Sequence, residues 1–236
     1  EAGGMPAEFN TIGPCDGIAQ GAGMHYVLPS RDIIAASTEL MAGAHQAAGL
    51  VLLGSCDKII PGMLMAALRL DIPSIFFTGG IMVSRRNLVT CDIKEAIGKF
   101  TAGTISRKQL DEIESSACGS AGACNMMGTA GTMACLLEAL GLALPETATL
   151  SAVDPARFRL ARTAGRQIVK LVKSDIRPSQ ILSRASFLNA IRVLCAFGGS
   201  TNALLHLPAI AAELDIHLPL EEFDRISRAT PLLCKF

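Results

Sequence analysis

Tryptophan is absent from this sequence, tyrosine occurs once, and neither sign of charge is in excess. Lysine and arginine together number 21, and so do aspartate and glutamate. A chain without a basic excess cannot neutralise many phosphates, and one with so few aromatic rings has few platforms on which bases stack. The composition therefore argues against a nucleic-acid partner.

Long hydrophobic runs are missing too, although half of the residues are hydrophobic and the mean hydropathy is +0.41. The apolar runs at 49–54 and 72–78 are far shorter than the roughly 20 residues that a membrane-spanning helix needs. Hydrophobicity of this kind indicates a large buried core, and we expect no membrane partner. The opening residues resemble neither a signal peptide nor a transit peptide, which favours a cytoplasmic location.

The eight cysteines are scattered among helix-forming residues and form no compact pairs. Because disulfide frameworks belong to short secreted chains, we expect free thiols in a reducing compartment. Four of the cysteines fit small buried apolar side chains: Cys91, Cys135, Cys195 and Cys234. The other four occur in turns rich in Gly, Asp and Ser, where a ligand or a reactive thiol is expected: Cys15, Cys56, Cys118 and Cys124.

Hydrophobic periodicity predicts buried strands at residues 50–53 and 74–78, with a helix from Pro61 to Leu70 between them. Strand, helix and strand within about thirty residues are typical of a βαβ unit in a parallel sheet. We therefore expect an α/β fold, with a parallel sheet and flanking helices followed by a mostly helical region. The other predicted helices are 30–47, 93–101, 107–114, 129–142, 155–173, 184–195, 201–215 and one from Leu220, with Gly141 and Gly198 as helix stops.

Two features concern domain organisation. Residues 144–153 have the weakest pattern and are the best candidate for a subdomain hinge or an exposed loop. The chain opens on Glu1 instead of Met and ends at Phe236 without a closing tail. We therefore expect one partial domain, residues 1–236, cut from a longer protein.

Three polar clusters interrupt the apolar pattern, at residues 10–24, 54–58 and 114–125. The second cluster directly follows a predicted strand. Its place is the carboxyl edge of the sheet, where open α/β folds bind their ligands. The clusters are therefore the first place to look for a functional site.

The side chains in these clusters are of two chemical kinds. Asp16 and Asp57 offer the oxygen ligands that Mg²⁺ takes, whereas Cys56 and Cys124 offer thiolates suited to an Fe–S cluster or zinc. A site with both kinds favours two metals with different tasks. A simpler interpretation stays open, in which Asp16 forms a turn, Asp57 caps a helix and residues 119–123 lead into a helix.

Six stretches of the sequence resemble the dihydroxy-acid dehydratase / 6-phosphogluconate dehydratase family, nearly collinearly over the whole chain. The motifs CDKIIPGMLMA and GGSTNALLHLPAIA are too long for chance similarity. The resemblance implies an α/β amino-terminal domain that holds an Fe–S cluster and Mg²⁺, usually in a homodimer, closed by a carboxyl-terminal β-barrel domain. The stretches are 10–17, 28–35, 53–66, 74–80, 114–142 and 198–207.

The resemblance implies a role for five residues of this chain. Cys56 and Cys124 match cluster-ligating cysteines, and a [2Fe–2S] cluster is favoured over [4Fe–4S]. Asp16 and Asp57 match magnesium ligands, and Lys58 matches a lysine that binds Mg²⁺ as its carbamate. The implied reaction dehydrates a small 2,3-dihydroxy acid to a 2-oxo acid.

The chain also departs from the family pattern. The first cluster cysteine of the family lies upstream of Glu1. The remaining magnesium glutamate and the serine base lie beyond Phe236, as does the β-barrel domain, so no catalytic base is assigned here. Cys15 is a possible substitute ligand, but we expect a packed thiol beside Asp16. His206, in the GGSTN-led helix, is also expected to be a packed residue.

Three functional hypotheses follow. The first is a hydro-lyase of valine and isoleucine biosynthesis, favoured by residues 116–118 and 138–142. The second is a sugar-acid dehydratase acting on an aldonate or phosphogluconate, which residues 124–130 resemble more closely. The third is an α/β fragment without activity of its own.

Overall fold

The computed structural model describes residues 2–234 and is built around a two-stranded parallel sheet. Strands β1 (Leu50–Gly54) and β2 (Ser74–Thr78) pair in register, Leu50 opposite Ser74 through Gly54 opposite Thr78. Helix α2 (Ile59–Leu70) connects them, which confirms the predicted βαβ unit. With ten α-helices among the described residues, the α/β fold class is also confirmed.

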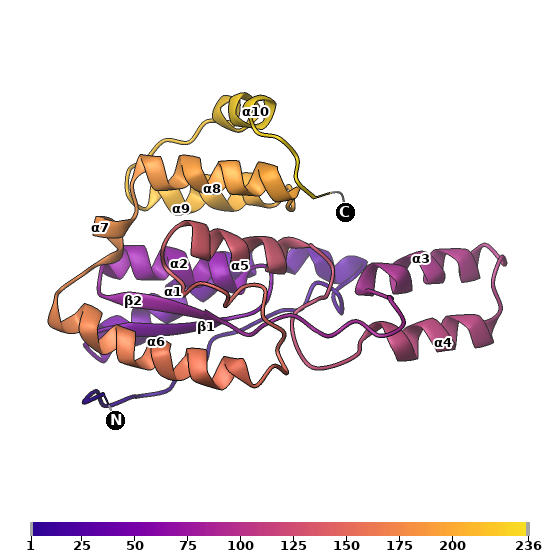
Figure 1. Cartoon of the computed structure of the whole chain (residues 1–236), viewed down its shortest axis with the longest axis horizontal. Coiled ribbons are helices and arrows are strands. Elements are labelled where there is room, and N and C mark those ends of the chain that lie inside the picture. The colour runs from indigo at the N-terminus through magenta and orange to yellow at the C-terminus, as the bar shows by residue number, and fades with distance from the viewer. Residues whose placement is uncertain (1, 235–236) are drawn as a thin grey trace.

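Helices cover both faces of the sheet (Figure 1). On one face α2 packs against α1 (Ser30–Ala44), and Phe76 of β2 joins this core. On the other face α6 (Ala156–Lys173) contacts both strands, and its Ile168 packs with Ile75 of β2. Because adjacent side chains of a strand point to opposite faces, β2 contributes to both layers and is buried on both sides.

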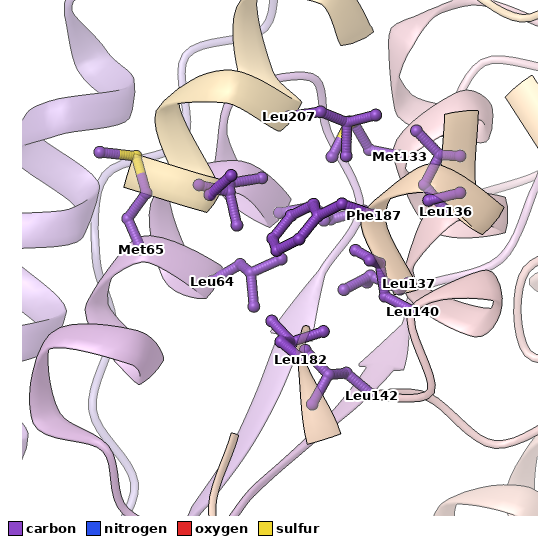
Figure 2. Packing of buried hydrophobic residues seen from close by; sticks show 14 of the residues in the cluster. Leu64, Met65, Met133, Leu136, Leu137, Leu140, Leu142, Leu182, Phe187 and Leu207 are labelled. Carbon is purple, nitrogen blue, oxygen red and sulfur yellow. The ribbon is translucent and has the colours of Figure 1, made fainter. Parts of the chain in front are cut away.

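A second helical layer completes the large core: α5 (Thr129–Ala139), α8 (Arg184–Phe197), α9 (Ala203–Ala212) and α10 (Leu220–Ala229). Figure 2 shows Phe187 of α8 among Leu64 of α2, Leu137 of α5 and Leu207 of α9. All four side chains are fully buried. The core therefore joins the βαβ unit to the carboxyl-terminal helices.

One pair of helices stands apart from these layers. Helices α3 (Thr90–Thr101) and α4 (Arg107–Ala117) pack on each other and project from one end of the molecule (Figure 1). Ala96 is the single buried residue of α3 among those described. We call these two helices and their connection the α3–α4 hairpin.

The predicted elements differ from the observed ones mainly at their ends. Helix α2 begins at Ile59, two residues before the predicted Pro61, and α1 ends at Ala44 because Gln46 adopts a left-handed φ of 52°. Gly141 and Gly198 have positive φ, which confirms both as helix stops. Two short elements were missed, the 3₁₀-helix η1 (Ala22–Tyr26) and α7 (Pro178–Ile181).

Residues 144–153 are held at several points. The hydroxyl of Thr78 donates to the carbonyl oxygen of Thr147 at 2.6 Å, and the Glu138 carboxylate accepts from the backbone N–H of Ala148 at 2.6 Å. Arg157 donates to the carbonyl oxygens of Thr147 and Leu150 at 3.2 and 3.0 Å. These contacts join the segment to β2, α5 and α6, and its role as a hinge stays a prediction.

Within residues 2–234, the structure contains no helix that is both long enough and apolar enough to span a membrane.

Candidate metal centre

The turn after β1 carries three of the candidate residues. Cys56, Asp57 and Lys58 occupy the four-residue connection between Gly54 and the start of α2 at Ile59. No side chain caps α2, so the interpretation of Asp57 as a helix cap is wrong. The turn lies at the carboxyl edge of the sheet, where the sequence predicts a ligand site.

A second segment brings Cys15 and Asp16 to this edge. The carbonyl oxygen of Cys15 accepts from the backbone N–H groups of Ile18 and Ala19, at 3.2 and 2.9 Å, which closes a tight turn. Asp16 begins that turn. The turn interpretation and the ligand interpretation of Asp16 are therefore compatible, because the turn is what orients the side chain.

A third segment places Cys124 beside the end of β2. The backbone N–H of Ala123 donates to Gly80 at 2.8 Å, and that of Met82 donates to Ala123 at 2.9 Å. Gly122 has a φ of +137°, and a Cβ there would lie 2.6 Å from the backbone nitrogen of Met82. Only glycine allows so close an approach, so this residue fixes where Cys124 lies.

The three segments meet in one cluster. A ligand atom of Asp16 and the Sγ atoms of Cys15 and Cys56 all lie within 4.8 Å of one another. Asp57 interacts electrostatically with Asp16, and Cys124 interacts with Asp16, Cys15 and Asp57. Asp16 and Cys56, two of the predicted ligands, thus lie together with Cys15, while Asp57 and Cys124 lie near enough to interact with them electrostatically, and their roles as ligands stay a prediction.

Ionising the acidic groups of this cluster is costly, because they are partly buried and lie close to one another. Burial, reinforced by Asp57, Cys15 and Asp16, raises the pKa of the Cys56 thiol to about 11. Burial and the neighbouring Asp16 carboxylate raise the pKa of Asp57. Burial likewise raises the pKa of Cys124. Crowded, partly buried acids of this kind are stabilised by a cation, so the donor set fits a magnesium ion and a thiolate-bound cluster.

Lys58 is buried beside this cluster, with 5% of its side chain exposed. Its Nζ lies 3.7 Å from Oδ2 of Asp57. The same Nζ lies 3.3 Å from Oδ1 of Asn202 and 3.3 Å from Nε2 of His206. A buried lysine needs such partners, because removing an ammonium group from water is costly.

His206 lies fully buried on α9, as expected of a packed residue, but it also has polar contacts that the sequence did not indicate. Its Nδ1 lies 3.5 Å from Nη1 of Arg31, on the side opposite Lys58. Burial, with the positive charges of Lys58 and Arg31, lowers the pKa of His206 to about 3. The ring is therefore neutral at neutral pH.

The remaining polar candidate of the third cluster lies outside the centre. Cys118 is exposed at the end of α4 and is not among the residues that could jointly hold a metal. The expected serine base was placed beyond Phe236, which is past the described residues. The one signal that could have pointed to Asn202 and His206 is the GGSTN-led motif, whose role the sequence left unassigned.

Comparison with known proteins shows which family the chain is similar to. All of residues 1–236 match the sequence model of the dihydroxy-acid/6-phosphogluconate dehydratase amino-terminal region. A dihydroxy-acid dehydratase of Hydrogenobaculum sp. is 50% identical over 240 residues, covering 100% of this chain and 43% of that protein. One from Syntrophobacter fumaroxidans is 53% identical, covering 99% and 43%, and one from Methanothrix thermoacetophila is 54% identical, covering 98% and 42%. The chain thus spans less than half the length of these relatives.

Proposed function

Because the chain belongs to the dihydroxy-acid/6-phosphogluconate dehydratase family, we propose that it forms the metal-binding part of a hydro-lyase. The substrate is a small 2,3-dihydroxy acid and the product is the corresponding 2-oxo acid. One observation carries this proposal: at the carboxyl edge of the sheet, ligand atoms of Cys15, Asp16 and Cys56 lie within 4.8 Å of one another, and Asp57 and Cys124 interact electrostatically with this group. A packed core alone gives no reason to bring these groups together.

The donor set divides by chemistry. Asp16 and Asp57 would hold Mg²⁺, with Lys58 beside them in its carbamate form. Cys56 and Cys124 would hold an Fe–S cluster, and [2Fe–2S] is the form we favour. When bound, Mg²⁺ would supply positive charge that acidifies the C2 proton of the substrate, and the Fe–S cluster would supply a Lewis acid for the departing C3 hydroxyl.

The residues of this chain prepare the site for that chemistry. Burial keeps the Cys56 and Cys124 thiols protonated until a metal replaces the protons, so metal binding releases protons. The neighbouring Asp16 and Asp57 carboxylates favour a divalent cation, because burial and the charge of Asp16 raise the pKa of Asp57. Lys58, almost without solvent contact, excludes water from one side of the pair.

The pathway assignment is valine and isoleucine biosynthesis, in a cytoplasmic homodimer. The names of the relatives support a dihydroxy-acid substrate. A sugar-acid substrate is the alternative, because the family also includes 6-phosphogluconate dehydratase and residues 124–130 resemble that branch. The chain alone, without the rest of its relatives' length, is expected to show no turnover and poor cluster retention.

The test uses the longest natural protein that contains this chain, reconstituted with iron, sulfide and Mg²⁺. We expect it to dehydrate 2,3-dihydroxyisovalerate and no aldonate; the reverse would select the sugar-acid alternative. Cys56→Ser should lower bound iron and abolish turnover, whereas Cys118→Ser, at an exposed thiol outside the cluster, should change neither. A protein with an intact cluster that dehydrates none of these acids would refute the proposal.

A further inference from the structure

We propose that Asn202, the residue directly before α9, and His206 of α9 are positioning residues that hold Lys58 in the magnesium site, with Arg31 behind the His206 ring. This inference rests on the function proposed above and assigns a role to the GGSTN-led motif. We call Asn202, His206 and Arg31 the Lys58 clamp. Its members come from α1 and from α9 with the residue before it, and Lys58 comes from the turn between β1 and α2.

The first argument is the number of directions in which Lys58 is held. Before any carbamate forms, the side chain of Lys58 ends in an ammonium group with three hydrogens, and its Nζ faces three partners. Two of them are neutral groups at 3.3 Å, Asn202 and His206, and the third is the Asp57 carboxylate at 3.7 Å. The nearest partners are thus supplied by α9 and the residue before it, so the place of the amine depends on how α9 docks.

The second argument is that the orientation of the His206 ring is fixed by its surroundings. Both ring nitrogens face a cation, Nε2 toward Lys58 and Nδ1 toward Arg31, and the residue has no exposed surface. A neutral imidazole has only one acceptor nitrogen, whereas lysine and arginine are donors only. The two cations therefore compete for one lone pair, and Lys58 at 3.3 Å is nearer to the ring than Arg31 at 3.5 Å.

The third argument is a closed path of polar contacts. The Asn202 amide nitrogen donates to Oγ of Ser200 at 3.2 Å, and Ser200 Oγ lies 3.0 Å from Oγ1 of Thr129. The Thr129 hydroxyl lies near Asp57 in turn and favours the charged form of that carboxylate, which opposes the rise of its pKa. The path runs from Lys58 through Asn202, Ser200 and Thr129 to Asp57, so one motif orients both the lysine and its neighbouring carboxylate.

These contacts fit a positioning role better than a purely packing one. The surrounding core is built of leucine and phenylalanine, and an apolar side chain of similar volume would fill the place of His206. Burying two polar groups there is costly unless they are paired. Their partner is Lys58, and its neighbour Asp57 belongs to the magnesium pair.

The test exploits the shape of the His206 ring. His206→Gln places an acceptor near Nε2, facing Lys58, whereas His206→Asn keeps a polar group only near Nδ1, facing Arg31. His206→Leu removes both. Mg²⁺ affinity is measured by calorimetry on the longest natural protein that contains this chain, and folding is followed by circular dichroism and thermal unfolding. His45→Gln, at an exposed histidine, is the matched control.

We expect His206→Gln to bind Mg²⁺ within about threefold of the parent chain, and His206→Asn and His206→Leu to bind at least about tenfold more weakly. Asn202→Leu, nearly isosteric, should weaken binding similarly and serves if His206→Leu does not fold. Equal affinities in the parent chain and all folded variants would overturn the proposal. An equal loss of Mg²⁺ affinity in His206→Gln, His206→Asn and His206→Leu would also overturn it, because only the packing of the ring would then matter.

A second measurement separates this inference from the proposed function. Acylation of Lys58 by acetic anhydride is followed by peptide mass spectrometry, with exposed Lys108 as the internal reference. Without metal, His206→Leu and Asn202→Leu should acylate Lys58 at least about tenfold faster, since nothing on α9 holds the amine. If the parent protein binds no Mg²⁺, the magnesium site is refuted. If the acylation rate of Lys58 is also the same in the parent and in the variants, the clamp is refuted as well.

Discussion

The helical core and the α3–α4 hairpin differ in how much of their surface they bury. Phe187, Leu64, Leu137 and Leu207 of the core are fully buried, whereas α3 buries only Ala96 among its described residues. The candidate centre lies between these regions but depends mainly on the core. Its segments are fixed by the ends of β1 and β2 and by α9.

The hairpin is anchored to the centre through Asn125, the residue after Cys124. The Asn125 side chain accepts from the backbone N–H of Thr90 at 2.9 Å and donates to the carbonyl oxygen of Ala117 at 3.1 Å. These bonds join the start of α3 to the end of α4. Stability is therefore concentrated in the helical core, whereas the α3–α4 hairpin contributes little beyond its base at Asn125.

The largest expected effect is the loss of a core ring. Phe187→Ala should lower the free energy of unfolding by about 3–5 kcal/mol, because the closely packed side chains around the ring cannot relax enough to fill the cavity. Phe100→Ala, in the hairpin and 38% exposed, should cost about 1 kcal/mol or less. Urea unfolding of both variants measures the difference. Similar losses would show that the hairpin is as tightly integrated as the core.

The next effect depends on pH and on His206. Its pKa falls from 6.5 to about 3 on folding, so between these values the unfolded chain binds a proton that the folded chain does not. Stability from this group is thus complete above pH 6.5 and is lost as the pH falls toward 3. Urea midpoints of the metal-free chain between pH 7 and pH 4 should fall more steeply than those of His206→Gln. If the urea midpoints of the parent chain and of His206→Gln fell equally over this pH range, the burial of His206 as a neutral ring would be contradicted.

Two glycines offer a matched pair. A Cβ on Gly62 of α2 would lie 2.6 Å from the carbonyl oxygen of Arg31 and 2.9 Å from Ile34, so Gly62→Ala should destabilise the protein by about 1–3 kcal/mol. Gly98 of α3 has no atom within 4 Å of that position, and Gly98→Ala should stabilise by up to about 1 kcal/mol through helix propensity. The unfolding temperature should therefore fall in Gly62→Ala and rise in Gly98→Ala. Shifts of the same sign would contradict the difference between the two regions.

The smallest effect concerns the surface of the hairpin. Arg107 lies 2.8 Å from Asp111 and over the Phe100 ring at 5.9 Å, but its side chain is largely exposed. Arg107→Ala should cost about 0.5 kcal/mol, and added salt should reduce the difference. Hydrogen exchange within α3 and α4 measures this local change. A loss above about 2 kcal/mol would mean that the hairpin is more tightly coupled than its burial indicates.

The sequence predicted the elements whose pattern is set by local burial. The strand 74–78 has the predicted bounds, because a continuous apolar run ends there at two glycines. The start of α2 was misplaced, since no side chain caps it and Pro61 alone does not mark where the helix begins. The four-residue α7 and η1 were missed because such short helices have no hydrophobic period.

The site was predictable only in part. Asp16, Asp57, Cys56 and Cys124 were named from their chemistry and their resemblance to a family; the structure places Asp16 and Cys56 within 4.8 Å of each other, and Asp57 and Cys124 in electrostatic contact with them. The Lys58 clamp was not foreseen, because Arg31, Asn202 and His206 come from segments that no local pattern relates. Their relation to Lys58 exists only after α1, α2 and α9 pack.

The wide spacing of the candidate ligands along the chain has a consequence for folding kinetics. Magnesium held by Asp16 and Asp57 would close one long loop, and a cluster held by Cys56 and Cys124 would close another, so the two groups would act on the unfolded chain like a pair of cross-links. Such a site has high contact order and cannot form before the sheet and α5 have docked. Unfolding of the loaded protein should therefore be slower than unfolding of the metal-free protein.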